Sequence, residues 1–251
     1  MALVNINYWS PSLAKETACH VLLPDRQARK GPYPVFYLLH GLSDDYTAWQ
    51  RWTSLERYVR ELPLIVVMPD GHRSFYCDAT AGYAYESALV KDLIGFVDTH
   101  FRTIKSGRGR VIGGLSMGGY GAMKLGLKHP DKFCSISAHS GVYLHVKERR
   151  WEQPGFPWMA EVTRIYGDEK TCAANDPFAL AAKLDPQKAP AIWLDCGVDD
   201  GLLPDNQALH AHLKKLRIKH QYHEYPGTHN WAYWDEHIQD ALAFHRQVLG
   251  L

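Results

Sequence analysis

Short runs of apolar residues recur along most of the chain. They are rich in β-branched or aromatic side chains, which is typical of strands buried on both faces of a parallel sheet. The runs lie at 35–39, 64–68, 110–114, 133–138 and 191–196. A further strand is expected over 219–225. These runs predict the central strands of one sheet.

Helical patterns lie between the runs, where apolar residues recur at offsets of three and four. The three stripes are Tyr85, Leu89, Leu93, Phe96 and Val97; Leu209, Leu213 and Leu216; and Trp234, Ile238, Leu242 and His245. Strands that alternate with helices predict an α/β fold with a mostly parallel sheet covered on both faces. Residues 2–23 alternate like a hairpin, so antiparallel strands are expected at the N-terminal edge.

One segment departs from this order. Residues 142–184 are rich in Trp, Pro and charged side chains, and we expect a cap-like insertion there, because insertions at the carboxyl edge of such sheets usually shape a ligand crevice. Trp151, Phe156, Trp158 and Tyr166 of this segment are candidates for stacking on a sugar or an aromatic group, although packing explains them equally well. With 251 residues and no internal repeat, the chain is expected to form a single domain over 1–251.

Composition excludes several classes of partner. The formal net charge is +1, with 28 Lys and Arg against 27 Asp and Glu, so neither nucleic acid nor an anionic membrane is an expected partner. Five cysteines without CxxC pairing argue against a disulfide framework. The N-terminal residues show no leader pattern, from which a cytoplasmic location is expected. The oligomeric state stays open, a homo-oligomer included.

The stretch GGLSMGGYG at 113–121 places one hydroxyl among glycines directly after a predicted strand. Where a strand turns sharply into a helix at a serine, the positions two before and two after leave no room for side chains. Gly114 and Gly118 occupy those positions around Ser116, which fits the nucleophile elbow GxSxG. Met117 should then begin a helix that ends before Pro130. The alternative is a glycine-rich turn with an ordinary serine.

A nucleophilic serine needs a histidine to take its proton and an acid to orient that histidine. In this kind of fold the acid and then the histidine follow the serine, each on a loop after a later strand. His229 follows the last predicted strand after a Pro-Gly turn. Asp199 and Asp200 both follow the strand before it, so spacing leaves the acid open between them, and Asp195 is disfavoured within the strand itself. Taken alone, the acid or His229 could be an ordinary turn or helix-start residue. The occurrence of serine, acid and histidine in the expected order, each on an expected loop, favours a catalytic role.

Acyl transfer also requires N–H donors for the oxygen that becomes negative. The residue after the nucleophile, Met117, should supply one, and the loop after the strand at 35–39 should supply the other through Leu42. Gly41 lets that backbone turn toward the site, and His40 is expected to be a packed, hydrogen-bonded core residue. The sequence contains no HExxH, no cysteine pair for zinc, no GxGxxG and no GxxxxGK[ST], so neither a metal nor a cofactor is expected.

Five ordered stretches carry a family resemblance. YLLHGLSDDYTAW, LIVVMPDG, GGLSMGGYGAMKLGLKHPDKF, CGVDDGLLPDN and YPGTHNWAYWDEHI together resemble the esterase D-like branch of the α/β-hydrolases, over about 33–249. That branch includes tributyrin, acetyl and feruloyl esterases, S-formylglutathione hydrolases and mycolyltransferases. The resemblance implies an α/β-hydrolase fold with Ser116 as nucleophile, His229 as base and Asp200 as its acid. It also implies that Leu42 and Met117 are the oxyanion donors.

These residues predict a serine carboxylesterase that acts on a small-molecule ester. Acetyl, butyryl, sugar-linked acetyl or feruloyl esters are the expected substrates. The alternatives are an S-formylglutathione hydrolase-like thioesterase, for which further motifs around the first loops are missing, and an acyltransferase that uses the same three side chains. Fold and triad determine the reaction type better than the substrate.

Overall fold

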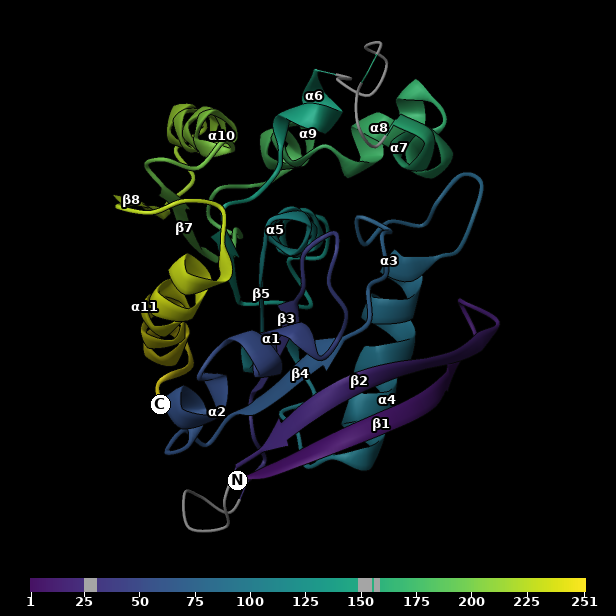
Figure 1. The fold of residues 1–251 in the computed structure, drawn as a ribbon, viewed down its shortest axis with the longest axis vertical. Helices are drawn as coiled ribbons and strands as arrows, with labels where there is room; N and C mark the ends of the chain where they lie inside the picture. The colour runs from purple at the N-terminus through teal and green to yellow at the C-terminus, as the bar shows by residue number, and fades with distance from the viewer. Residues whose placement is uncertain (25–30, 149–154, 156–158) are drawn as a thin grey trace.

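The central feature of the structure is one mixed sheet (Figure 1). The computed structural model describes residues 1–24, 31–148, 155 and 159–251, and in that part of the chain the sheet has eight strands in the order β1-β2-β4-β3-β5-β6-β7-β8. The strands are β1 (Ala2–Ser10), β2 (Lys15–Leu23), β3 (Val35–Leu39), β4 (Ile65–Pro69), β5 (Arg110–Leu115), β6 (Ser135–His139), β7 (Ala191–Gly197) and β8 (Gln221–Tyr225). Strand β2 pairs antiparallel with both β1 and β4, and every other pairing is parallel.

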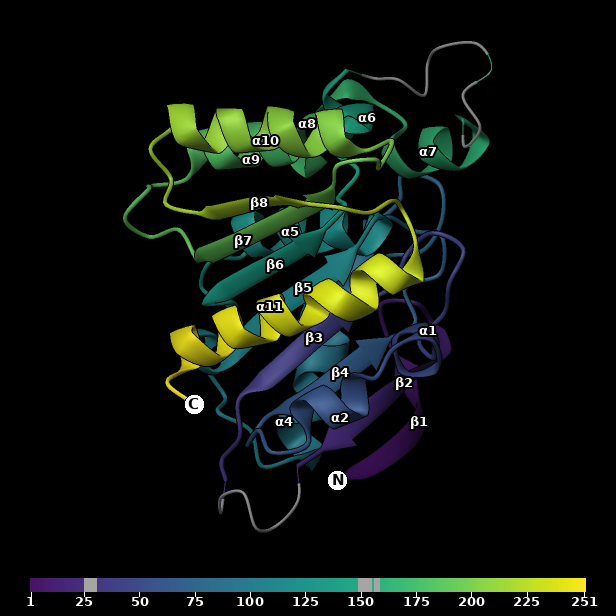
Figure 2. The ribbon, with the colours of Figure 1, turned by 60° about the vertical axis from the view of Figure 1, so that its left-hand side comes forward.

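The helices between the strands are mostly short. They are α1 (Ala48–Trp52), α2 (Leu55–Val59), α3 (Tyr85–Ser87), the π-helical turn η1 (Ala88–Leu93), α4 (Ile94–His100), the 3₁₀ turn η2 (Gly107–Gly109), α5 (Met117–Lys128), α6 (Leu144–Lys147), α7 (Met159–Tyr166), α8 (Glu169–Asn175), α9 (Pro177–Lys183), α10 (Leu203–Lys215) and α11 (Trp231–Leu249). Figure 2 shows α11 lying across one face of the sheet, on the same side as α1 and α2. The other face is covered by α4 and α5.

Alternation within the central strands builds two separate cores. In β3, Val35, Tyr37 and Leu39 face the core shared with α4 and α5, whereas Phe36 and Leu38 face the core shared with α11. All five residues are fully buried, as expected for a parallel strand covered on both sides. The carboxyl ends of the parallel strands therefore meet at one edge, where the loops after β3, β4, β5, β7 and β8 gather.

The predicted sheet is confirmed. Each apolar run forms a strand at the expected place, within one or two residues of the predicted bounds, and the final strand forms as β8. The predicted hairpin forms as β1 and β2, with Ala2 opposite Leu23 and Ser10 opposite Lys15. It adds the two antiparallel strands at the edge.

The predicted helices also form, with one difference in geometry. The stripes correspond to α3 through α4, to α10 and to α11, and α5 begins at Met117 and ends at Lys128, before Pro130. Within the first stripe, η1 widens to the i→i+5 pattern over Ala88–Leu93. There the Asp92 carboxylate accepts hydrogen bonds from the Ser10 hydroxyl (2.6 Å) and the Ser12 N–H (2.8 Å), which join this helix to the β1–β2 turn.

The segment between β6 and β7 contributes α6 to α9, which lie together with α10 at the end of the molecule opposite β1 and β2 (Figures 1 and 2). Tyr120 of α5 makes one of the segment's contacts with the rest of the molecule, since the Tyr120 hydroxyl donates to the carbonyl of Asn175 (2.7 Å). Residues 149–154 and 156–158 of the expected insertion at 142–184 lie outside the described residues. Its cap-like role stays a prediction, as does the single-domain organisation of 1–251.

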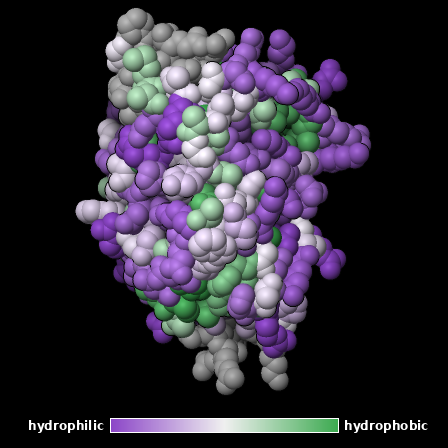
Figure 3. Space-filling view, turned by 90° about the vertical axis from the view of Figure 1, so that its right-hand side faces the viewer, coloured by the Kyte–Doolittle hydropathy of each residue, from purple (hydrophilic) through white to green (hydrophobic). Residues whose placement is uncertain are grey.

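The outer surface is mixed in character. On the face shown in Figure 3 hydrophilic side chains predominate, and hydrophobic ones gather in separate small areas. None of the helices in the described ranges has the length and apolar character needed to cross a lipid bilayer. The five cysteines all lie within the described ranges, where no disulfide joins one of them to another.

Candidate active site

Ser116 stands at the turn from β5 into α5. Its backbone has φ 53° and ψ −117°, a conformation that residues with a side chain rarely adopt. A Cβ atom on Gly118 would lie 2.4 Å from the Leu39 carbonyl oxygen, and one on Gly114 would lie 2.6 Å from the backbone of Gly118. Both glycines are therefore required, because β3, β5 and α5 approach one another at backbone distance around the serine.

Ser116, His229 and Asp200, which are far apart in the sequence, lie in contact. The His229 Nε2 atom is 3.1 Å from the Ser116 Oγ atom, and the His229 Nδ1 atom is 2.8 Å from the Asp200 Oδ2 atom. Such a hydroxyl–imidazole–carboxylate chain can move a proton from the hydroxyl to the ring while the carboxylate stabilises the resulting cation.

Backbone hydrogen bonds between two loops make this meeting possible. The loop after β7 donates from Val198 N–H to the Tyr225 carbonyl (2.8 Å) and from Asp199 N–H to the Gly227 carbonyl (3.0 Å). The Asn230 side chain then caps α11 by accepting from Tyr233 N–H (3.0 Å). The acid loop is thus held against the loop that carries His229.

The structure distinguishes the three candidate acids by burial and contact. The Asp200 side chain is fully buried against His229, whereas Asp199 is exposed and meets the histidine loop only through its backbone. Asp195 lies in β7, where it accepts from the Trp193 indole N–H (2.7 Å) and the Tyr233 hydroxyl (2.9 Å). Of these three carboxylates, Asp200 is the one that contacts the imidazole.

Hydrogen bonds to its carboxylate oxygens favour the ionised form of Asp200. Burial by itself raises the pKa of this carboxyl, but the bonds from His229 and from the Leu202 N–H (2.8 Å) bring the pKa below its usual value. Asp200 is therefore ionised at neutral pH and can only accept. The proton of the neutral His229 ring must then lie on Nδ1, which leaves Nε2 free to accept from Ser116.

Leu42 and Met117 both line the same cleft as Ser116. Met117 is the first residue of α5, and Leu42 belongs to the loop after β3. Among the described residues neither N–H donates to a protein acceptor, so both are available to a ligand. His40 is buried and hydrogen-bonded on both ring nitrogens, so its expected place in the core is confirmed.

The cleft has a volume of about 770 Å³ and an aromatic wall. It is lined by residues of the loops after β3, β4, β5, β6, β7 and β8: Gly41, Leu42, Ser43, Asp44, Arg73, Phe75, Leu115, Ser116, Met117, Val142, Asp200, Gly201, Leu202, His229, Asn230, Trp231 and Trp234. The rings of Trp231 and Trp234 meet edge to face at 5.3 Å, and Trp234 meets the His229 ring in the same way at 4.9 Å. Sequence analysis did not assign these tryptophans to the site, although the aromatic cluster directly after His229 was a usable signal.

Arg73 and Phe75 reach the cleft from the loop after β4. Sequence analysis assigned neither residue to the site. The Arg73 guanidinium is bound by the Glu161 carboxylate of α7 through two N–H donors, one of them Nη2 at 2.7 Å. This bidentate pair connects the segment between β6 and β7 to the edge of the cleft.

The aromatic candidates of that segment have different outcomes. Tyr166 is fully buried and donates to the Tyr120 hydroxyl (2.8 Å), so it packs inside the protein and does not face the cleft. Trp151, Phe156 and Trp158 lie outside the described residues. Within the described ranges, no group of three or more His, Cys, Asp or Glu side chains is placed to hold a metal ion.

Comparison with known proteins relates this geometry to a family. The model of the Esterase family matches residues 10–245. An acetyl esterase of Caldicellulosiruptor saccharolyticus is 31% identical, with 99% of each chain covered. Among solved structures, the substrate-bound fluorophosphonate-binding serine hydrolase F of Staphylococcus aureus is 29% identical with a TM-score of 0.88, covering 99% of this chain and 98% of that one. The S-formylglutathione hydrolase of the same organism is 28% identical with a TM-score of 0.82 and the same coverage.

These likenesses confirm the α/β-hydrolase fold and the resemblance to the esterase D-like group. They extend over nearly the whole chain and agree with the predicted mostly parallel sheet and its antiparallel N-terminal edge. The chain therefore belongs to the Esterase family and is an α/β-hydrolase that hydrolyses carboxylic esters.

Proposed function

We propose that the protein is a serine carboxylesterase for short-chain or small acyl esters. In this proposal Ser116 is the nucleophile, His229 the general base and Asp200 the acid that orients His229. The observation that carries the proposal is the pair of contacts from Ser116 Oγ to His229 Nε2 (3.1 Å) and from His229 Nδ1 to Asp200 Oδ2 (2.8 Å) at the edge of an open cleft.

The first half of the reaction forms an acyl-enzyme. The Ser116 oxygen attacks the ester carbonyl carbon while His229 Nε2 takes the hydroxyl proton, and a tetrahedral intermediate results. The bond from the carbonyl carbon to the alcohol oxygen then breaks, and the proton on Nε2 passes to that oxygen. Asp200 stays ionised throughout and stabilises the imidazolium.

Two backbone donors stabilise the negative oxygen of the intermediate. Leu42 N–H and Met117 N–H are proposed for this role, because both residues line the cleft with Ser116 and neither N–H has an acceptor among the described residues. Losing one such donor typically lowers turnover by about 10²- to 10³-fold.

The second half of the reaction regenerates the enzyme. A water molecule gives a proton to His229 Nε2 and attacks the acyl carbon of the Ser116 ester. The intermediate then releases the carboxylic acid, and the proton on Nε2 returns to the Ser116 oxygen. The same residues thus serve both halves.

The size and lining of the cleft support a small ester. A volume of about 770 Å³ lies within the usual range for small-molecule sites and must hold both the acyl and the alcohol part of the substrate. Apolar walls at Phe75, Trp231 and Trp234 suit an acyl chain or a ring. The similarity to an acetyl esterase supports a small acyl group. The proposed substrates include sugar-linked acetyl and feruloyl esters.

A second candidate is the thioester of S-formylglutathione, favoured by the likeness to the S. aureus S-formylglutathione hydrolase. The three side chains and the two donors would act on a thioester in the same way. Transfer of the acyl group to an alcohol or sugar is the third candidate, and it differs only in what attacks the acyl-enzyme.

One set of assays tests these assignments. Ser116→Ala should reduce turnover of p-nitrophenyl acetate to background, and ordinary turnover in that variant would refute the nucleophile. With the wild type, kcat/KM for p-nitrophenyl esters from acetate to palmitate should fall steeply beyond butyrate. Methyl ferulate and acetylated xylan are assayed beside them as examples of feruloyl and sugar-linked acetyl esters. Higher kcat/KM for S-formylglutathione would favour the thioesterase, and new ester products with added alcohol would favour the transferase.

A further inference from the structure

Tyr76 lies between the loop after β4 and helix α5, and it is fully buried. A Cβ atom added to Gly71 would lie 2.2 Å from its ring, and one added to Gly121 of α5 would lie 2.4 Å from it, so the ring fills a closely fitted slot. Its hydroxyl donates to the carbonyl of His40 (3.0 Å), in the loop that carries Leu42. Burial raises the pKa of Tyr76, so the hydroxyl stays a donor at all working pH values.

The next peptide of that loop is held by the His40 ring. Gly71 N–H donates to His40 Nε2 (2.8 Å), which places the ring proton on Nδ1, and Nδ1–H donates to the Gly41 carbonyl (2.7 Å). The carbonyl and the N–H of a trans peptide point in opposite directions. A Gly41 carbonyl directed into the protein at His40 therefore directs the Leu42 N–H the other way, to the cleft.

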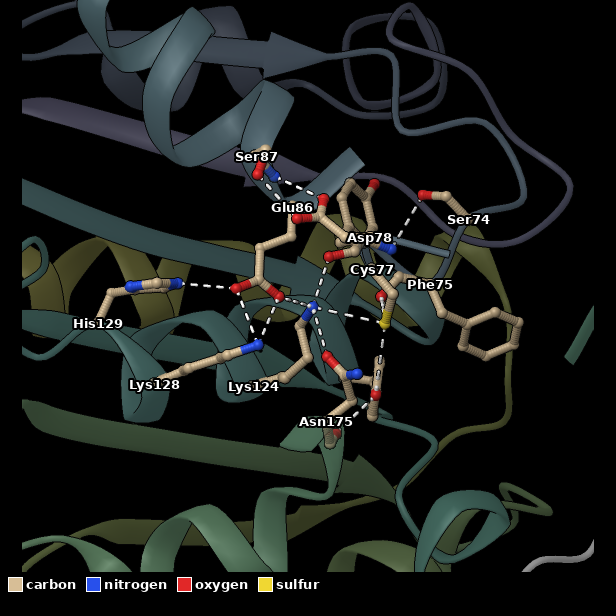
Figure 4. Close-up of polar contacts among 12 residues, drawn as sticks. Ser74, Phe75, Cys77, Asp78, Glu86, Ser87, Lys124, Lys128, His129 and Asn175 are labelled. Atoms are coloured by element: carbon tan, nitrogen blue, oxygen red, sulfur yellow. Dashed lines mark hydrogen bonds and ion pairs between the residues drawn. The ribbon is translucent and has the colours of Figure 1, made fainter. Parts of the chain in front are cut away.

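The loop after β4 is itself anchored by a buried ion pair. The Lys124 ammonium, fully buried in α5, donates to the Tyr76 carbonyl (2.5 Å) and to the Glu86 carboxylate (2.8 Å). Figure 4 shows Lys128 and His129 completing the partners of Glu86. Burial raises the pKa of Glu86, but Lys124 and His129 outweigh it and hold the pKa well below the usual range, so the pair is ionised.

The loop that this ion pair anchors has an energetically unfavourable backbone conformation. His72, Phe75 and Tyr76 all have positive φ values, between 47° and 51°, which residues with side chains rarely adopt. Such conformations persist only where the surroundings impose them, and they concentrate at functional sites. Lys124 and Ser116 belong to the same short stretch of chain, so α5 positions both the nucleophile and the Tyr76 loop.

We infer that Tyr76 and His40 are positioning residues that hold the 40–42 loop so that Leu42 N–H meets the developing oxyanion. The inference rests on the proposed function, in which Leu42 is an oxyanion donor. Neither side chain lines the cleft. Both act on the reaction only through the backbone they hold.

Tyr76→Phe removes the hydroxyl and keeps the ring. We expect kcat for p-nitrophenyl acetate to fall about ten- to a hundredfold, which is at most the decrease caused by removing one oxyanion donor. KM should change by less than about twofold. The matched control is Tyr37→Phe in β3, because the Tyr37 hydroxyl is buried and has no hydrogen-bond partner among the described residues. The control should keep both constants within about twofold.

A transition-state readout separates positioning from mere structural support. Rates are expressed per active site, counted by complete reaction with a fluorophosphonate, so unfolded protein does not contribute. The inhibition constant of a trifluoromethyl ketone, which forms a tetrahedral adduct with serine, should rise in Tyr76→Phe by the same factor as kcat/KM falls. Unchanged kcat per active site, or a loss explained by fewer active sites alone, would overturn the inference.

A pair of His40 variants keeps the test open if Tyr76→Phe does not fold. The amide nitrogen of His40→Asn lies near the place of Nδ1 and can still donate to Gly41, whereas that of His40→Gln reaches toward Nε2. We expect kcat to be at least about fivefold higher for His40→Asn, and the reverse order would contradict the inference. If Ser116→Ala is inactive while Tyr76→Phe has wild-type kcat, the positioning role fails and the proposed function stands.

Discussion

Replacing Asp200 by Asn changes one atom in the buried contact that holds His229. Leu202 N–H donates to Asp200 Oδ1, so this position must keep an oxygen, and the amide nitrogen of Asn is forced into the place of Oδ2. There it faces His229 Nδ1 as a donor. The ring must then carry its proton on Nε2, where it can no longer accept from Ser116.

The size of the effect follows from this change of tautomer. An imidazole with the wrong tautomer lowers turnover in other serine hydrolases by about 10⁴-fold, which corresponds to about 5.4 kcal/mol in the activation barrier. The side chain is fully buried, so water offers no alternative partner. We expect a loss of the same order in kcat for Asp200→Asn.

The matched control is Asp199→Asn, one residue away. Asp199 is exposed and contributes its backbone N–H to Gly227, which the substitution leaves in place, so kcat should stay within about threefold. Both variants are assayed with p-nitrophenyl acetate after thermal melts show that they fold. A kcat for Asp200→Asn above a tenth of the wild-type value, or an equal loss in Asp199→Asn, would refute the assignment of the acid.

Three further outcomes follow from the structure. Gly118→Ala should lower the free energy of unfolding, measured in urea, by about 1–3 kcal/mol, because the added Cβ would lie 2.4 Å from a backbone oxygen. Gly95→Ala in α4 has open space around it and should raise that free energy by up to about 1 kcal/mol, so equal effects of the two variants would contradict the prediction. Burial lowers the pKa of His245 to about 3, whereas the same imidazole in the unfolded chain has a pKa near 6.5. The free energy of unfolding should therefore fall by up to about 1.4 kcal/mol per pH unit as the pH drops below 6.5, and His245→Gln should flatten this dependence. Glu161→Gln leaves Arg73 without its anionic partner. The ratio of kcat/KM for an ester with a free carboxylate to kcat/KM for a neutral ester of equal length should then rise about three- to tenfold. If this ratio is unchanged, Arg73 does not reach the substrate.

Sequence patterns predicted the sheet well because its central strands are buried on both faces. Every residue of β3 and β4 is buried, so each strand is an unbroken apolar run that ends at a loop. The elbow was predictable for a different reason. Gly114 and Gly118 are imposed by backbone contacts around Ser116, and such contacts leave a direct trace in the sequence.

The choice between Asp199 and Asp200 could not be read from the sequence. Both residues occupy one loop at the right distance from β7, and what separates them is the turn in which Asp200 N–H donates to the Gly197 carbonyl (3.1 Å) and the side chain enters the protein. That turn depends on contacts with the histidine loop, which is distant along the chain. Spacing along the sequence therefore could not decide whether Asp199 or Asp200 contacts the histidine.

The lining of the cleft was beyond sequence reasoning for a similar reason. Trp234 belongs to a predicted helical stripe and lines the cleft, whereas Tyr166, a candidate for stacking on a ligand, packs on Tyr120. Periodicity indicates which side of a helix is apolar, and it does not indicate whether that side meets a core or a cleft. The π-helical turn at Ala88–Leu93 was missed because spacings of four residues suit an α-helix as well.

The measurement that tests the central claim most directly is covalent trapping. A fluorophosphonate is added at one equivalent per chain, residual esterase activity is followed, and the trypsin peptide 111–124, which contains Ser116, is analysed by mass spectrometry. We predict one adduct per molecule, located on Ser116, with activity lost in step with labelling. Full activity after complete labelling of Ser116, or an adduct on another residue that accounts for the inactivation, would contradict the account.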